Sequence, residues 1–143
     1  MKRTLHEAAF RLAFDMQTQM ADKVGDFGVE LTPLKMRILR VIWSASTNNV
    51  SAQDIVKTVK RDKAQVARII EDLCAQGLVR REVDPSDRRS KILFLTDQGA
   101  AIFASVEEIE ATFAAALTRG IDRSDLAAFF RVADKISENL KEM

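Results

Sequence analysis

Two short groups of polar side chains in the middle of the sequence carry hydrogen-bond donors that suit a polyanion. The first group is Lys63, Gln65 and Arg68. Lysine and arginine bind phosphates or the edge of guanine, and the amide of glutamine pairs with adenine. The second group is the pair Arg88 and Arg89, and arginine is favoured in a narrow, electronegative minor groove. These residue types point to contact with double-stranded DNA.

Three nearby residues complete the candidate contact set. Ala64 presents a methyl group that can touch the methyl of thymine. Asp87 is too acidic to touch DNA usefully, so we expect it to hold an arginine by a bidentate ion pair. Ser51 stands at the head of the preceding predicted helix. The predicted DNA-binding residues are therefore Ser51, Lys63, Ala64, Gln65, Arg68, Asp87, Arg88 and Arg89.

Start and stop signals for two helices place the first group on an outward face. Ser51 and Asp54 fit a capping box and predict a short helix to about residue 59. Asp62 is a typical cap for a longer helix to residue 76, where Gly77 allows a left-handed termination. The apolar residues of that helix share one side, namely Val66, Ile69, Ile70, Leu73 and Cys74. The first group lies on the opposite side, and Cys74 is expected to be a buried small hydrophobe rather than a redox sensor.

A β-hairpin is predicted directly after the longer helix. Residues 78–83 and 91–95 are rich in Val, Ile, Leu and Phe, and a polar stretch with Pro85 separates them. Such a pattern is typical of two strands joined by a polar, here basic, tip. Two short helices with a tight turn form a helix-turn-helix, whose second helix enters the major groove, and a hairpin after it is a wing.

Four further helices flank this region. Thr32 followed by Pro33 is a typical helix start, and a polar loop at 44–49 follows that helix. The predicted flanking helices are residues 5–24, 33–44, 96–117 and 122–140. The expected fold is mainly α with a small β-hairpin, in the order α-α-α-α-β-β-α-α. The first helix carries more apolar surface than one neighbour can cover, because Phe10 and Phe14 add a second apolar strip.

Charge is distributed unevenly along the chain. Residues 31–91 hold 13 Lys or Arg against 7 Asp or Glu, whereas the flanks together hold 9 against 14. The whole chain has a formal net charge of only +1. A basic middle between acidic ends suggests that the middle meets a polyanion, and a merely solvated charged face is the competing interpretation.

Several function classes are disfavoured by composition. No nucleophile with a base, phosphate-cradling glycine loop or pair of histidine ligands is present, so we expect no enzyme and no cofactor. One cysteine and one histidine do not form a standard zinc cage, so we expect no metal. No apolar run reaches the about 20 residues of a membrane span, and we expect no membrane partner and a cytoplasmic location.

The segment from Leu31 to Gly99 resembles the MarR-type winged-helix regulators. The wing string 84–90, Asp-Pro-Ser-Asp-Arg-Arg-Ser, and the Leu-Thr-x-x-Gly pattern at 95–99 carry most of the resemblance. Further matching residues are Leu31, Thr32, Pro33, Leu73, Gly77, Leu78, Val79 and Arg81. The resemblance implies a homodimer, a palindromic operator and regulation by a small molecule.

The resemblance also implies roles for single residues and a division of the chain. The arginine matching Arg89 enters the minor groove and the aspartate matching Asp87 orients it, while residues 63–68 read the major groove. Many relatives carry Ser or Thr where Ala64 stands, so operator preference does not transfer. Residues 1–30 are expected to be an N-terminal dimerisation helix, 31–95 the winged helix-turn-helix, and 96–143 the C-terminal dimerisation helices.

A repressor released by a small aromatic or anionic effector is the expected function. Met16, Met20 and Trp43 are the candidate lining of an effector pocket, with plain core packing as the alternative for them. A winged-helix module that binds only another protein is the alternative function. The basic wing favours the regulator, because binding phosphates requires cations and binding a protein does not.

Overall fold

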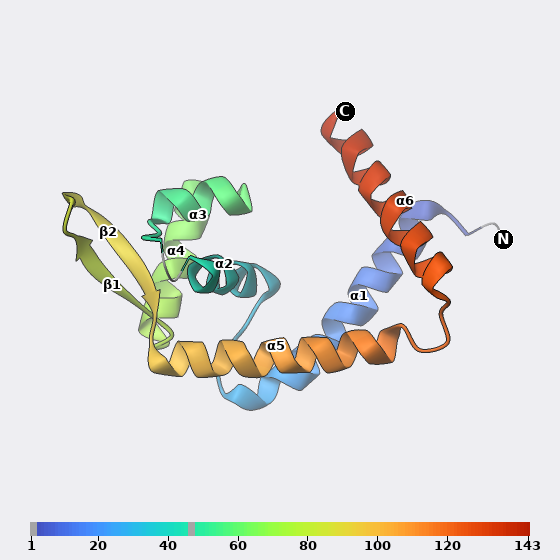
Figure 1. The fold of residues 1–143 in the computed structure, drawn as a ribbon, viewed down its shortest axis with the longest axis horizontal. Helices are drawn as coiled ribbons and strands as arrows, with labels where there is room; N and C mark the ends of the chain where they lie inside the picture. The colour runs from blue at the N-terminus through green and yellow to red at the C-terminus, as the bar shows by residue number, and fades with distance from the viewer. Residues whose placement is uncertain (1–2, 46–47) are drawn as a thin grey trace. The chain divides into compact units, whose positions relative to one another are not determined.

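The computed structural model describes residues 3–45 and 48–143, which fall into two compact units, Met1–Glu108 and Ile109–Met143. Ser46 and Thr47, in the loop expected after the second helix, lie outside the described residues. The elements are α1 (Leu5–Val24), η1 (Gly25–Phe27), α2 (Pro33–Ser44), α3 (Ala52–Val59), α4 (Lys63–Ala75), β1 (Val79–Asp84), β2 (Asp87–Leu95), α5 (Asp97–Leu117) and α6 (Arg123–Lys141) (Figure 1). Six α-helices and one hairpin in this order confirm the predicted fold class for the described residues, and the short 3-10 helix η1 was not predicted.

Local capping explains where the helices of the first unit begin. Thr32 accepts a hydrogen bond from the backbone N–H of Lys35, and Pro33 occupies the first turn of α2. Asp62 accepts in the same way from the backbone N–H of Gln65 at the start of α4. Thr4 and Glu7 form a full capping box at the start of α1.

The hairpin is tighter and longer than expected. β1 and β2 pair antiparallel from Val79 opposite Leu95 to Asp84 opposite Asp87, with an irregularity after Val83. The prediction that the second strand begins near residue 91 is therefore wrong, because β2 already begins at Asp87. The reason lies in the turn, where a carboxylate oxygen of Asp84 accepts from the backbone N–H and from the hydroxyl of Ser86, at 2.9 and 2.7 Å.

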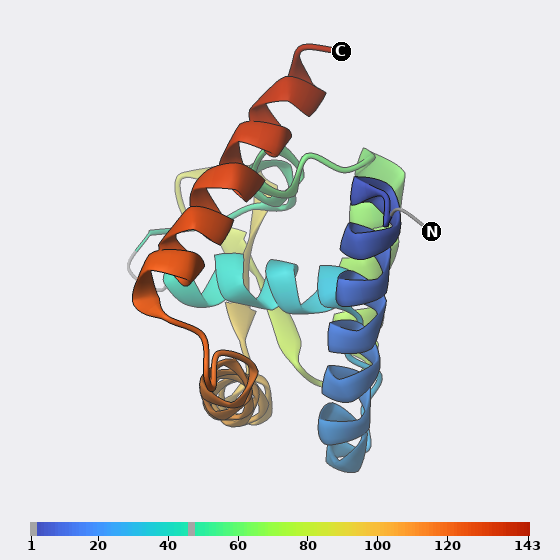
Figure 2. The ribbon, with the colours of Figure 1, turned by 90° about the vertical axis from the view of Figure 1, so that its right-hand side faces the viewer.

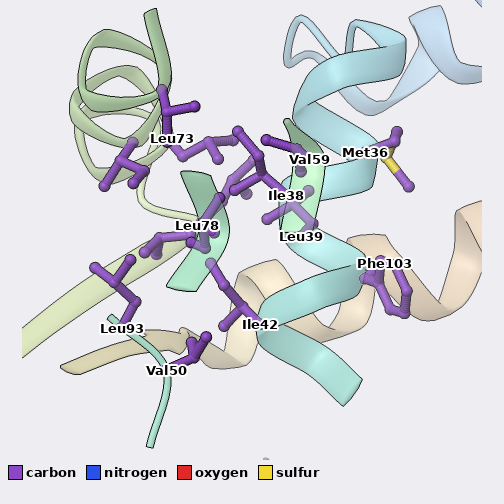
Figure 3. Packing of buried hydrophobic residues seen from close by; sticks show 14 of the residues in the cluster. Met36, Ile38, Leu39, Ile42, Val50, Val59, Leu73, Leu78, Leu93 and Phe103 are labelled. Atoms are coloured by element: carbon purple, nitrogen blue, oxygen red, sulfur yellow. The ribbon is translucent and has the colours of Figure 1, made fainter. Parts of the chain in front are cut away.

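One hydrophobic core holds the helix-turn-helix and the hairpin together. Leu39 of α2, Ile55 of α3 and Leu73 of α4 are completely buried, and Figure 3 shows side chains from α2, α4 and the hairpin converging on one cluster. Its other fully buried members are Ile38, Val66, Ile70, Leu78, Phe103 and Val106. Since α4 buries one face here, its opposite face is turned to solvent.

The start of α5 is joined closely to the end of α4. The hydroxyl of Thr96 donates to the carbonyl of Gly77 at 2.6 Å and accepts from the N–H of Gly99 at 3.0 Å, while the N–H of Thr96 donates to the carbonyl of Leu78. A Cβ atom at position 99 would collide with that same Leu78 carbonyl. The Leu-Thr-x-x-Gly pattern therefore encodes a joint between helices.

Apolar side chains of α1 and α6 remain exposed within this chain. On α1 only Val24 is buried, and on α6, a single unbroken helix (Figure 2), no residue is buried. The exposed aromatic residues are Phe10 and Phe14 on α1 and Phe129 and Phe130 on α6. Neither helix finds cover for its apolar strip among the residues of its own unit. Within the described residues no helix is long and apolar enough to cross a membrane.

Candidate nucleic-acid interface

The N-terminal half of α4 presents the predicted base-reading residues. Lys63, Ala64 and Arg68 are exposed and Gln65 is half-buried, whereas Val66 on the other face is completely buried. The Asp62 cap satisfies a free N–H at this helix end and leaves the side chains of the first turn directed outward. This geometry is the one that the sequence predicts for a recognition helix, and contact of these residues with DNA stays a prediction.

Ser51 holds the beginning of α3. Its hydroxyl accepts from the backbone N–H of Asp54 at 3.3 Å and donates to the Asp54 carboxylate at 3.0 Å, while the Ser51 N–H donates to the same carboxylate. The hydrogen bonds from the backbone and the hydroxyl of Ser51 lower the pKa of Asp54. Ser51 therefore has a capping role in addition to its predicted contact with DNA.

Arg88 and Arg89 lie at the tip of the wing. They are exposed and are the second and third residues of β2, directly after the turn formed by Pro85 and Ser86. Asp87 does not pair with an arginine side chain within the described residues, so the expected bidentate ion pair is wrong. Its carboxylate accepts instead from the backbone N–H of Arg89 at 3.0 Å. The tight turn explains the difference, because a short side chain reaches the backbone two residues ahead more easily than a guanidinium farther out.

A hollow of about 420 Å³ lies between the start of α3, the middle of α4 and the wing. It brings together three predicted residues, Ser51, Asp87 and Arg89. It does not include the base-reading group of α4 or Arg88. Its other lining residues are Ala52, Gln53, Ala67, Ile70, Arg81, Ser90, Lys91 and Leu93.

Arg81 and Lys91 are lining residues of this hollow that the sequence analysis did not single out as contacts. Lys91 of β2 pairs with Val83 of β1, and Val83 is two residues from Arg81 along β1. Residues two apart in a strand share a face, so the pairing register puts both cations on one side of the sheet. The signal was present in the sequence as alternating basic residues, but its use required the strand register.

Three acidic groups around the interface are paired with neighbouring cations. Asp72 pairs with Lys35 at 2.8 Å, Glu71 pairs with Arg81 at 2.8 Å, and Glu82 pairs with Arg80, which also lies 4.6 Å above the Phe94 ring. Besides Arg80 and Arg81, the exposed cations of the helix-turn-helix and wing are Lys57, Lys60, Arg61, Lys63, Arg68, Arg88, Arg89 and Lys91. The surface charge of this region is therefore positive, which suits phosphate.

The three candidate effector residues occupy different surroundings. Met16 is partly exposed on α1, and Met20 packs against the core. Trp43 is 48% exposed and lies 5.4 Å from the Phe103 ring, measured between ring centroids. A role for these residues in binding an effector stays a prediction.

A family model described as the MarR family matches residues 29–90. Among curated proteins, an uncharacterized HTH-type transcriptional regulator, YdgJ of Bacillus subtilis (strain 168), is 24% identical over 109 residues. The alignment covers 76% of this chain and 65% of that protein, so this chain spans slightly less than two thirds of the length of the relative.

Solved structures match over nearly the whole chain. MepR of S. aureus in a complex with DNA has a TM-score of 0.83 at 18% identity, with 96% of each chain covered. CouR, a transcriptional repressor bound to a 23-mer DNA duplex, has a TM-score of 0.79 at 26% identity, with 94% of this chain and 92% of that chain covered. Wild-type MarR of E. coli has a TM-score of 0.71 at 18% identity, with 95% and 98% covered. Residues 29–90, the winged-helix segment, thus match the MarR family model, and nearly the whole chain shares the winged-helix fold of these transcription regulators.

Proposed function

We propose that this protein is a homodimeric repressor that binds a palindromic DNA operator and is released from it by a small-molecule effector. The observation that carries DNA binding is the arrangement of exposed cations on two projections of one rigid core. Lys63 and Arg68 lie on the outward face of α4, and Arg88 and Arg89 lie at the wing tip. A helix for the major groove and arginines for the minor groove are the parts that such a protein needs.

The exposed apolar strips of α1 and α6 support the homodimer. Phe10, Phe14, Phe129 and Phe130 are each more than half exposed within the chain, and apolar surface of this extent is favourable to bury against another copy. A dimer with twofold symmetry reads two half-sites about 34–36 Å apart, which corresponds to a palindromic operator. We expect a mass of about 32 kDa in sedimentation equilibrium, twice the 16.0 kDa of one chain.

Repression follows from occupancy, because a dimer seated on a promoter blocks polymerase without further contacts. The S. aureus MepR structure that shares this fold is a DNA complex, and CouR is named a repressor. An effector bound near Met16, Met20 and Trp43 would change the separation of the two recognition helices in the dimer. The dimer would then lose its contact with one of the two half-sites. The protein acts where the DNA is, in the cytoplasm.

The decisive experiment is a titration of the intergenic DNA beside the protein's own gene with wild type and Arg89→Ala at several salt concentrations. We expect tight binding that weakens steeply with salt, and a variant whose salt slope is smaller by about 1 and whose affinity is lower. Arg119→Ala, which removes an exposed cation between α5 and α6, is the matched control and should bind as wild type does.

Binding that is absent or insensitive to salt, with other duplexes and an added effector also tried, would instead favour a module that binds only protein. The effector is tested separately through Trp43, the single tryptophan of the chain. Small aromatic and anionic compounds that bind should change its fluorescence and weaken operator affinity. An unchanged operator affinity across a broad panel would contradict effector release and leave DNA binding standing.

A further inference from the structure

Two adjacent acidic residues near the C-terminal end of α4 are both engaged by cations from other elements. The Lys35 ammonium of α2 lies 2.8 Å from the Asp72 carboxylate, and the Arg81 guanidinium of β1 lies 2.8 Å from the Glu71 carboxylate. Acidic side chains are disfavoured at a helix C-terminus by the helix dipole. Their presence here therefore calls for another role, and their ion pairs indicate it.

The two carboxylates stand on opposite flanks of α4. Consecutive residues of an α-helix are about 100° apart, so Glu71 and Asp72 fall about 130° to either side of the buried face formed by Val66, Ile70 and Leu73. Arg68 lies between these flanks, directly opposite the buried face. One cation thus holds α4 from the α2 side and the other from the wing side.

Such opposed contacts oppose rotation of α4 about its own axis. Apolar packing is not directional. The core therefore selects which face of α4 is buried, but it fixes the exact rotation of the helix about its axis only weakly. Turning the helix in either direction lengthens one of the two ion pairs. The angle of the outward face, and with it the aim of Gln65 and Arg68, depends on both pairs.

Lys35 is the stronger of the two anchors. Among residues 3–45 and 48–143 it is the one charged residue that is buried, with 4% of its surface exposed. Its ammonium also donates to the carbonyl of Glu30 at 3.3 Å and to the side-chain oxygen of Gln76 at 3.5 Å. Three acceptors match the three donors of an ammonium group, and they tie the end of α4 to the segment that enters α2.

We propose that Lys35 and Arg81 are positioning residues that set the rotation of the recognition helix α4 through Asp72 and Glu71. The proposal rests on the proposed DNA-binding function for its consequence, which is discrimination between operator and other DNA. It concerns geometry rather than contact, since Lys35 is too buried to touch a phosphate.

The test compares Asp72→Asn and Glu71→Gln with wild type for binding to the operator and to a scrambled duplex of equal length. Asp72→Asn keeps a side-chain oxygen that can accept from Lys35 beside its two other acceptors, and circular dichroism with urea unfolding checks that the variant is folded under the binding conditions. We expect operator affinity to fall about tenfold for Asp72→Asn and about threefold for Glu71→Gln, with binding to the scrambled duplex unchanged. Glu138→Gln, which removes the exposed Lys135–Glu138 pair of α6, should change neither.

A charge swap separates positioning from direct contact at the wing. The double variant Glu71→Arg with Arg81→Glu can re-form the ion pair with its charges exchanged, so operator affinity should return toward wild type relative to Arg81→Glu. Failure of this rescue would show that Arg81 acts by touching DNA and would overturn the proposal for that residue.

A measurement without DNA keeps the proposal independent of the proposed function. Residual dipolar couplings of the α4 backbone N–H groups report the orientation of this helix in the free protein. We expect them to change in Asp72→Asn and Glu71→Gln but not in Glu138→Gln. Unchanged couplings in both variants would overturn the proposal, whether or not the wild type binds an operator. Changed couplings in a protein that binds no DNA would support it while refuting the proposed function.

Discussion

At the scale of single residues, the connection between α4 and α5 requires a glycine, which has no side chain, at position 99. Gly99 approaches the Leu78 carbonyl so closely that a methyl group has no room. We expect Gly99→Ala to lower the free energy of unfolding by about 1–3 kcal/mol, because backbone must move to admit the methyl group. Urea unfolding at one fixed protomer concentration measures this loss.

Gly25 supplies the control for that substitution. A Cβ atom there meets nothing within 4 Å, and its φ of −59° suits any residue. Gly25→Ala should be neutral or stabilising by up to about 1 kcal/mol, since it only restricts the unfolded chain. Equal losses in both variants would mean that the close approach at Gly99 has no special cost.

Cys74 is a second residue whose environment predicts its behaviour. Burial raises the pKa of the Cys74 thiol, and the charge of Arg81 offsets only part of this effect. Since the thiolate is the reactive form, we expect thiol reagents at pH 8 to modify Cys74 more slowly in the folded protein than in urea. Cys74→Ser should bind operator as wild type does. Rapid modification of the folded protein that also releases DNA would instead identify a redox sensor.

At the scale of elements, α3 depends on its capping box. The pKa of Asp54 is lowered from its usual 3.8 by hydrogen bonds from Ser51. A carboxylate with a lowered folded-state pKa stabilises above its unfolded-state pKa, and the contribution is lost as the pH falls through the folded-state value. Asp54→Asn should therefore cost about 0.5–1 kcal/mol at pH 7 and almost nothing near pH 2.

The pH series that checks this uses urea unfolding of the DNA-free protein, with Asp97→Asn as the control for an exposed acid in the first turn of another helix. The difference between wild type and Asp54→Asn should shrink on acidification below about pH 4. A difference that stays constant from pH 7 to pH 2 would show that packing, rather than the charge of the cap, accounts for the loss.

At the scale of the whole molecule, the exposed face of α6 predicts self-association. Phe129 and Phe130 are 52% and 56% exposed and lie edge to face at 5.9 Å. A charge placed among them must be desolvated if they are covered by a second copy. We expect Phe130→Glu to sediment as a monomer at micromolar concentration and to bind a two-half-site operator at least about tenfold more weakly.

Arg131→Glu introduces the same acidic side chain on the opposite side of α6 and is the matched control, since residue 131 lies about 160° from the centre of the predicted apolar face. It should stay dimeric. A monomeric control, or a dimeric Phe130→Glu, would remove α6 from the proposed interface.

Much of the fold followed from local signals in the sequence. Thr32-Pro33, Ser51 with Asp54, and Asp62 begin helices in the structure as predicted, because caps act on backbone groups only three residues away. Helical periodicity likewise predicted the outward face that carries Lys63 and Arg68. Such features are set by neighbours in the chain, so the sequence by itself determined them.

The remainder was decided by contacts between distant residues. The hollow at the wing unites Ser51 with Arg89, and the anchors of α4 unite Lys35 with Asp72, yet no local pattern links these partners. The sequence predicted an arginine side chain as the partner of the Asp87 carboxylate, whereas in the structure that carboxylate accepts from the backbone N–H of Arg89 in the tight turn. Which donor meets which acceptor depends on strand register and helix rotation, and only the tertiary structure decides these, because they arise from packing of the whole core.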